Sequence, residues 1–340
     1  MYNTKPPTLL QPVRGENRTK RQVPSTRHYN MVYFSSMNEP LRIVYASDDN
    51  YVGLTAISAV SLLKHNTGAQ INLLGYNLKP ASVELVRSRV EDHGGLFSHF
   101  DATPFISKLE LLKVSHYTSY AIFARMFIPE LIRTDDRVLY LDCDTLVTDR
   151  LDDLMDLDLH GHAFALALDA VHPAYKKVIS LPPDKPYYNS GVMLMDLAAW
   201  RNRDCSRRFT EELMHPHGRV ILPEQDVIAR MMGDEVEPLP SKWNFLSQYI
   251  LQRRKDTPAI YHFSGNTLGR PWFTSSKHPM REAYRQAAAE ANLPEVAEQP
   301  RPLPFEYKVQ YWLYRLLPRT LFTPICNLMY RTHIRLTYGV

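Results

Sequence analysis

The chain lacks several features that define common classes of protein. None of its apolar runs approaches the roughly 18 residues of a membrane-spanning helix, and its first residues lack the apolar core of a secretory signal. We therefore expect neither an integral membrane protein nor a secreted one. Only 3 cysteines occur in 340 residues, which argues against a disulfide framework or a zinc site and fits a reducing, cytoplasmic setting.

Two glycine-rich phosphate-binding motifs are also absent. The sequence contains neither the G-x-G-x-x-G fingerprint of dinucleotide-binding folds nor the G-x-x-x-x-G-K-[ST] motif of a P-loop. A nucleotide bound by this chain must therefore be held by other groups.

Positive charge is concentrated at the two ends of the chain. Residues 1–38 and residues 301–340 each contain six Lys/Arg and one acid, although the whole chain has a net charge of only +4. The remaining residues carry 28 basic and 34 acidic side chains. A nucleic-acid-binding core needs a basic groove, so this acidic body argues against nucleic acid as a partner.

Apolar runs alternate with helical patterns through most of the chain. Strands are predicted over residues 41–46, 71–78, 96–102, 137–147, 162–169, 190–197 and 260–265. Helices are predicted over residues 53–65, 82–95, 119–133, 198–215 and 223–234. This alternation indicates an α/β fold whose central sheet is mainly parallel and flanked by helices.

Two aspartates separated by one residue follow the apolar run 137–141. Ligands bind beyond the carboxyl ends of the strands in parallel α/β sheets, so Asp142 and Asp144 stand where a ligand is expected. Carboxylate oxygens suit hard cations such as Mg²⁺ and Mn²⁺. A solvated acidic turn explains the same residues without a metal, because short D-x-D matches also occur by chance.

Polar residues also lie at the ends of two other predicted strands. Asp48 and Asn50 carry hydrogen-bonding groups suited to a base and a ribose, although turn chemistry alone also explains them. His262 offers an imidazole nitrogen to a metal, or is a satisfied core histidine. Gly265 allows close backbone approach, and Arg270 suits a phosphate.

Taken in order, these segments resemble glycosyltransferase family 8, and more narrowly the bacterial galactosyl- and glucosyltransferases that build lipopolysaccharide or lipooligosaccharide. The resemblance covers roughly residues 41–290 and is far more specific than a single D-x-D. It is carried by IVYASDDNY (43–51), FARMFIPELI (123–132), RVLYLDCDTLV (137–147), YYNSGVMLMDLAAWR (187–201), PEQDVIARM (223–231), KWNF (242–245), HFSG (262–265) and RPW (270–272).

The resemblance implies a GT-A fold, in which a Rossmann-like sheet binds a UDP-sugar and a divalent metal, usually Mn²⁺, with Mg²⁺ as the alternative. It implies metal binding by Asp142, Asp144 and His262. The donor-binding residues that it implies are Ala46, Asp48, Asn50, Arg125, Asp142, Cys143, Asp144, Asp169, Asn189, Gln225, Gly265 and Arg270. The chain departs from the family at Arg270, where Lys is common, and at Glu224, where Asp is usual.

The family transfers a hexose with retention of configuration, for which two routes exist. In one route a carboxylate forms a covalent glycosyl intermediate, and Glu224 and Asp226 are the candidates. In the other, the acceptor hydroxyl attacks from the leaving-group face while the Gln225 carbonyl stabilises positive charge at the anomeric carbon. We favour the second route, because an amide is a poor nucleophile. Glu224 and Asp226 also suit the first turn of a helix beginning at Pro223.

The last forty residues combine eight aromatic with six basic side chains. Apolar residues between 308 and 319 share one helical face, which suits an anionic membrane surface, although docking onto the body is the alternative. We therefore predict a flexible basic extension (1–38), a GT-A catalytic domain (39–292), and a Pro-rich linker with a membrane-associating tail (293–340).

Three functions follow. The first is a metal-assisted, retaining hexosyltransferase that moves galactose or glucose from a UDP-sugar to an oligosaccharide or glycolipid acceptor at the inner face of the cytoplasmic membrane. The second is a metal-dependent nucleotide-sugar hydrolase or phosphoesterase, although the sequence offers no second carboxylate/His cluster for a two-metal site. The third is a non-catalytic protein that binds anionic glycolipid, against which the D-x-D and Gln225 argue.

Overall fold

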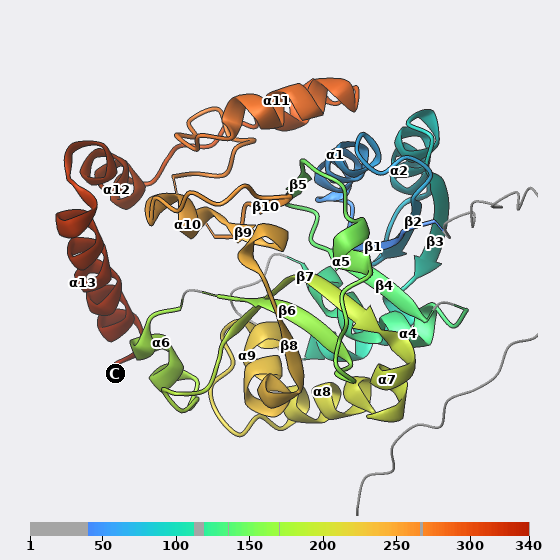
Figure 1. Ribbon diagram of the computed structural model, residues 1–340, viewed down its shortest axis with the longest axis horizontal. Helices are drawn as coiled ribbons and strands as arrows, with labels where there is room; N and C mark the ends of the chain where they lie inside the picture. The colour runs from blue at the N-terminus through green and yellow to red at the C-terminus, as the bar shows by residue number, and fades with distance from the viewer. Residues whose placement is uncertain (1–39, 112–118, 135, 170, 266–267, 340) are drawn as a thin grey trace, which may run out of the picture. The chain divides into compact units, whose positions relative to one another are not determined.

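The computed structural model describes residues 40–111, 119–134, 136–169, 171–265 and 268–339. The predicted N-terminal extension lies outside these residues. The described part of the chain is built around a seven-stranded and a three-stranded β-sheet (Figure 1).

The larger sheet is mainly parallel, as predicted. Its strands, in spatial order, are β3 (Leu96–Asp101), β2 (Gln70–Gly75), β1 (Arg42–Ser47), β4 (Arg137–Leu141), β7 (Tyr188–Asp196), β6 (Phe164–Leu168) and β8 (Val236–Leu239). Four neighbouring pairs are parallel, and only β7 runs antiparallel to its neighbours β4 and β6. The carboxyl ends of β1 and β4 therefore meet at one edge of the sheet, which is where ligands bind in such folds.

The smaller sheet separates what the sequence predicted as one strand. Residues 137–147 form β4 and then β5 (Thr145–Val147), with Asp142-Cys143-Asp144 between them. Strand β5 leaves the larger sheet and pairs antiparallel with β10 (Ile260–His262), which in turn pairs parallel with β9 (Phe245–Leu246). The acidic connection therefore lies where the chain crosses from one sheet to the other.

The helices agree with the prediction in part. The α-helices are α1 (Val52–Leu63), α2 (Pro80–Asp92), α3 (Thr103–Ile106), α4 (Ile128–Leu131), α5 (Asp152–Met155), α6 (Pro173–Val178), α7 (Leu197–Asn202), α8 (Cys205–Met214), α9 (Pro223–Met231), α10 (Ser247–Leu251), α11 (Arg281–Glu290), α12 (Phe305–Leu316) and α13 (Arg319–Tyr338). The 3₁₀ segments are η1 (Ser107–Leu111), η2 (Tyr120–Phe127), η3 (Gly233–Glu235), η4 (Ser241–Trp243) and η5 (Pro294–Glu298). Helices α3, α5, α6, α10 and α11 were not predicted, whereas α13 lies in the basic, aromatic C-terminal tail, which we predicted to be helical without giving bounds for this helix.

Two predicted helices are broken. Residues 119–133 form η2 followed by the short α4, because Pro129 has no N–H for an uninterrupted helix and suits only the first turn of a new one. Residues 198–215 form α7 and α8, which are separated by Asp204 in the left-handed conformation (φ 52°).

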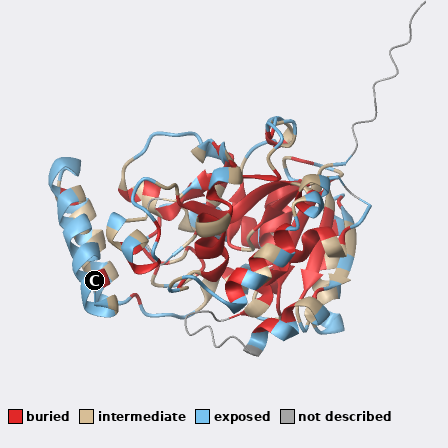
Figure 2. Ribbon diagram, turned by 90° about the horizontal axis from the view of Figure 1, so that it is seen from below, coloured by how far each residue is buried: buried red, intermediate tan, exposed pale blue. Residues whose placement is uncertain are grey.

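The hydrophobic core lies on both faces of the larger sheet. One face packs mainly against α1, α2, α11 and the smaller sheet, and the other against η2, α4 and α7–α9. Figure 2 shows the buried strands inside and the mostly exposed C-terminal helices outside. This rigid layer holds the strand ends that carry the predicted site.

The C-terminal segment is helical and attached to the body at a few points. Leu293 and Ala297, within the predicted linker, are buried in the main core, while Phe322 and Ile334 are the buried residues of α13. The predicted domain boundaries remain a prediction. Among the described residues, no helix combines the length and apolarity that crossing a membrane requires.

Candidate active site

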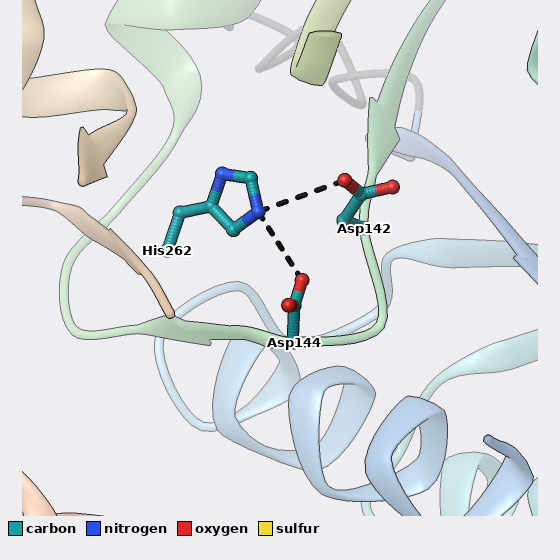
Figure 3. A group of neighbouring side chains, drawn as sticks. All are labelled: Asp142, Asp144 and His262. Carbon is teal, nitrogen blue, oxygen red and sulfur yellow. Dashed lines mark ion pairs between the residues drawn. The ribbon is translucent and has the colours of Figure 1, made fainter. Parts of the chain in front are cut away.

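The three predicted metal ligands lie together, where the two sheets meet. Pairing of β10 with β5 places His262 opposite Thr145, next to the connection that carries the two aspartates. Figure 3 shows the two carboxylates and the imidazole facing one another. His262 Nε2 lies 3.2 Å from Asp144 Oδ1 and 3.6 Å from Asp142 Oδ2. We call Asp142, Asp144 and His262 the acid–imidazole cluster.

Each carboxylate of the cluster has one oxygen directed at the imidazole and the other bound elsewhere. Asp142 Oδ1 accepts hydrogen bonds from Arg125 Nη2 and Tyr140 Oη, both at 2.7 Å. Asp144 Oδ2 accepts a hydrogen bond from Arg270 Nη1 at 2.6 Å. These hydrogen bonds fix the orientation of each carboxylate, so that its other oxygen, Asp142 Oδ2 or Asp144 Oδ1, remains available to a ligand.

The imidazole is fixed in the same way, and a glycine allows it to pack against the backbone of β7. His262 Nδ1 lies 2.9 Å from Asn244 Oδ1, which leaves Nε2 directed at the carboxylates. A Cβ added to Gly191 would lie 2.1 Å from His262 Cε1 and 2.7 Å from Asp142 Oδ2. Two carboxylate oxygens and one imidazole nitrogen, brought together by this close packing, fit a divalent cation.

The charges of the cluster depend on one another. Burial by itself would raise the pKa of Asp144, but the neighbouring His262 and Arg270 outweigh it and lower that pKa. Burial would likewise lower the pKa of His262, and Asp144 and Asp142 instead raise it. Burial, followed by the two flanking carboxylates, raises the pKa of the Cys143 thiol well above its ordinary value. Cys143 is therefore a protonated thiol that packs against the core and a poor metal ligand.

Beside the cluster, the predicted donor-sugar residues form a second group, the amide network of Asp169, Asn189 and Gln225. Asn189 Nδ2 donates to Gln225 Oε1 at 3.0 Å and to Asp169 Oδ2 at 3.2 Å. Ser190 N also donates to Gln225 Oε1 at 3.3 Å. Gln248 Nε2 donates to Asp169 Oδ1 at 2.8 Å. The Gln225 carbonyl is therefore held in one orientation by two N–H donors.

Asp226 is fully buried and accepts four hydrogen bonds. Its Oδ1 accepts from Tyr175 Oη at 3.0 Å and Tyr187 Oη at 2.7 Å, and its Oδ2 accepts from Ile221 N at 2.7 Å and Leu222 N at 2.9 Å. This carboxylate ties the start of α9 to two tyrosines, which is a structural task that occupies both of its oxygens.

Glu224 lies in the first turn of α9, as predicted, and is buried. Burial raises the pKa of its carboxyl group, and the positive charge of Arg125 offsets this effect only in part. Because a raised pKa favours the protonated form, Glu224 is a weaker nucleophile than an exposed carboxylate.

The residues predicted to hold the nucleotide lie at the end of β1. Ala46 and Asp48 are buried there, and β1 is paired with β4, which leads to Asp142. Asn50 N donates to Asp48 Oδ1 at 2.9 Å, so the predicted turn chemistry is present. Gly265 follows β10 in the left-handed conformation, with φ 67°.

Four residues of this region were missed by the sequence reasoning. Tyr140 and Asn244 hold the cluster, Gly191 lets His262 approach the backbone, and Gln248 holds Asp169. Gly191 and Asn244 lie within the motifs NSGV and KWNF. Tyr140 and Gln248 carry no signal of their own, because their partners are set by the fold.

The mainly parallel sheet and the aspartate pair between two sheets define a GT-A-like α/β fold. Residues 42–275 match the model of glycosyl transferase family 8, and the chain belongs to this family. The activity that the family defines is glycosyl transfer.

The chain is similar to curated proteins and to a solved structure. It is 26% identical over 270 residues to General stress protein A of Bacillus subtilis, covering 73% of this chain and 92% of that protein. It is 25% identical over 270 residues to Lipopolysaccharide 1,2-glucosyltransferase of Escherichia coli, covering 74% and 78%. The galactosyltransferase LgtC, solved with donor and acceptor sugar analogues, matches with TM-score 0.65 at 25% identity, covering 79% of this chain and 99% of that one. Some glycosyltransferases of Streptococcus pneumoniae are longer, and the chain spans 36% to 60% of them.

Proposed function

We propose that the protein is a metal-assisted, retaining hexosyltransferase that moves galactose or glucose from a UDP-sugar. The observation that carries this proposal is the position of the acid–imidazole cluster directly beside the amide network. Arg125 links the cluster to the network through Ser190, since its guanidinium donates to Asp142 Oδ1 at 2.7 Å and to the Ser190 carbonyl at 2.7 Å. Ser190 N in turn donates to Gln225 Oε1. A diphosphate held at the cluster would therefore place its sugar against the amides.

Mn²⁺ is the proposed cofactor, with Mg²⁺ as the alternative, because an imidazole among the ligands favours Mn²⁺. Asp142, Asp144 and His262 would hold the cation, which when bound supplies Lewis-acid stabilisation of the leaving diphosphate. Arg270 Nη1 lies 2.6 Å from Asp144 Oδ2, so its guanidinium adds fixed positive charge beside the proposed cation site. Asp48 and Asn50 at the end of β1 would hold the uridine.

We favour attack of the acceptor hydroxyl from the leaving-group face. Asn189 Nδ2 and Ser190 N hold the Gln225 carbonyl in place, and its dipole would stabilise positive charge at the anomeric carbon. The rival nucleophiles are less suited, because both oxygens of Asp226 are saturated by hydrogen bonds and burial favours the protonated form of Glu224.

For the acceptor we propose a sugar hydroxyl of a lipopolysaccharide or lipooligosaccharide-type glycolipid, reached at the inner face of the cytoplasmic membrane. The E. coli relative named above is a lipopolysaccharide glucosyltransferase. Helices α12 and α13 expose large apolar side chains, including Trp312, Leu316, Leu328 and Leu336, alongside the basic residues of the tail. Such a surface suits peripheral binding to an anionic bilayer.

The second candidate is a metal-dependent nucleotide-sugar hydrolase. Among the described residues, the acid–imidazole cluster is the single grouping of metal-ligating side chains, which disfavours two-metal hydrolysis. Release of UDP that does not rise on addition of any glycan acceptor would favour this candidate.

The decisive experiment measures UDP release from a panel of UDP-hexoses, with Mn²⁺ and with EDTA. We expect slow, metal-dependent hydrolysis of one donor without acceptor, which would also identify the sugar. If no UDP-sugar is bound or cleaved, the transferase proposal is wrong and the glycolipid-binding alternative leads.

Asp144→Asn tests the metal assignment. We expect this variant to lose metal-dependent binding of the UDP-sugar in calorimetry while keeping the fold, as judged by circular dichroism. Asp152→Asn is the matched control, because Asp152 also pairs with an arginine, Arg150 at 2.8 Å, but on the surface. Wild-type binding by Asp144→Asn with Mn²⁺ would refute the assignment.

A further inference from the structure

A continuous series of side-chain amides runs beneath the site, from the cluster to the amide network. Asn244 Oδ1 lies 2.9 Å from His262 Nδ1, and Asn244 Nδ2 donates to Asn189 Oδ1 at 2.9 Å. Asn189 Nδ2 then donates to Gln225 Oε1 at 3.0 Å. Asn244 is fully buried, and Asn189 and Gln225 are almost fully buried. No role follows for Asn244 from its residue type alone.

The orientation of every group in this series is determined by one backbone N–H. Gly191 N donates at 3.0 Å to Asn189, and a backbone N–H can only donate, so the Asn189 atom facing it must be the oxygen. The Asn244 atom facing that same oxygen must then be its NH₂ group. The other Asn244 atom, which faces His262, is therefore the carbonyl oxygen.

This orientation decides which nitrogen of His262 carries the proton. A carbonyl oxygen only accepts, so His262 Nδ1 must be the N–H donor. In the neutral ring, Nε2 then presents its lone pair toward Asp142 and Asp144. With the opposite tautomer, Nε2 would carry a hydrogen and could not bind a cation.

We propose that Asn244 is a positioning residue with two tasks, one for each end of its amide. Its oxygen holds His262 as the Nδ1–H tautomer with Nε2 aimed into the cluster. Its NH₂ group holds Asn189, and through it the Gln225 carbonyl, in the orientation required beside the donor sugar. This inference rests on the proposed function, because the first task has a purpose only if the cluster binds a cation.

The two tasks are separated by two substitutions. Asn244→Leu removes both hydrogen-bonding ends at similar volume, so Mn²⁺ affinity should fall about 10- to 100-fold, the usual cost of losing the partner of a metal-binding histidine. Asn244→Asp keeps an accepting oxygen toward His262 but opposes the Asn189 oxygen with a second acceptor. Mn²⁺ affinity should then stay within about threefold of wild type, while UDP-sugar affinity in the presence of Mn²⁺ should fall about tenfold.

The tautomer is measured directly in the metal-free protein by ¹H–¹⁵N correlation spectra of histidine labelled with ¹⁵N, at a pH where the imidazoles are neutral. His278 is an internal reference of the opposite kind, since its Nδ1 accepts from Met280 N at 3.1 Å and its Nε2 faces Ser247 Oγ at 3.2 Å. We expect Nδ1–H for His262 and Nε2–H for His278 in the wild type. In Asn244→Leu only the His262 signal should change.

Binding of MnCl₂ alone, followed by calorimetry, completes the test. The inference is overturned if Nδ1 of wild-type His262 carries no proton, or if Asn244→Leu keeps both the Nδ1 proton and the wild-type Mn²⁺ affinity. Failure of the wild type to bind Mn²⁺ would instead contradict the proposed function. If Asn244→Leu does not fold, the comparison of Asn244→Asp with wild type decides the second task, and the wild-type spectrum decides the first.

Discussion

Replacing Gly191 by alanine adds one methyl group at the wall of the acid–imidazole cluster. The added Cβ would lie 2.1 Å from His262 Cε1, where ordinary contact begins near 3.4 Å. The ring must therefore move by about 1.3 Å, the difference between these distances, whereas a metal–ligand bond tolerates only about 0.2 Å. We expect His262 to be lost as a ligand.

The expected magnitude follows from that displacement. Loss of one aligned ligand should weaken Mn²⁺ binding at least about 100-fold, which corresponds to about 2.7 kcal/mol. Overpacking should also lower the free energy of unfolding by about 1–3 kcal/mol, which a protein of this size can lose without unfolding. Affinity for Mn²⁺ should therefore fall much further than stability.

The assay is calorimetry with MnCl₂ and then UDP, together with a thermal melt of each variant. Gly233→Ala is the matched control, because no heavy atom lies within 4 Å of a Cβ at that position and its φ is not positive. The control should bind Mn²⁺ like the wild type. If Gly191→Ala binds Mn²⁺ within about threefold of wild type, the reasoning from the close approach is refuted.

Three further predictions concern the donor, the pH and the tail. Arg270→Lys keeps the charge but loses the planar fork, so the calorimetric affinity for UDP should fall about tenfold, and an unchanged affinity would count against a phosphate contact. Burial lowers the pKa of His278 to about 3, so only the unfolded state takes up a proton there as the pH drops below about 6.5. The free energy of unfolding should then decrease by up to about 1.4 kcal/mol per pH unit between these values, and urea melts of His278→Gln should lack this part of the slope. Trp312→Glu combined with Leu328→Glu should reduce cosedimentation of the protein with anionic vesicles, whereas the control Leu96→Glu, at an exposed leucine of β3, should not. If the wild type, the double variant and the control bind the vesicles equally, the tail is not the membrane-binding segment.

The central part of the fold was predictable because its pattern is local. Strands β1 and β4 are short apolar runs, and helices α1 and α2 have regular apolar spacing with clear ends. Two aspartates mark the end of β4 at Leu141 in the sequence, but the apolar pattern does not predict the passage of the chain into a second sheet. This passage arises from pairing of β5 with β10, far along the chain.

The candidate site was predictable to the extent that its residues carry unusual chemistry at strand ends. Asp142, Asp144 and His262 were named because carboxylates and imidazoles there suggest a ligand, and the structure brings them together. Tyr140 and Asn244 were not named, because a tyrosine within an apolar strand and an asparagine in a loop have many roles. Their function comes only from the atoms that face them.

The crossing of the chain between the two sheets has a thermodynamic consequence. The smaller sheet consists of strands of two or three residues, so only a few paired residues hold its strands to one another, although most of their side chains are buried. The proposed cation would bridge Asp142 at the end of β4 to His262 on β10, and so would fasten the smaller sheet to the larger one. A ligand that is present at 100 times its dissociation constant adds about 2.7 kcal/mol to the stability of the state that binds it. Amide hydrogen exchange in β5, β9 and β10 should therefore slow on addition of Mn²⁺, so that the donor would meet a surface whose rigidity depends on the metal.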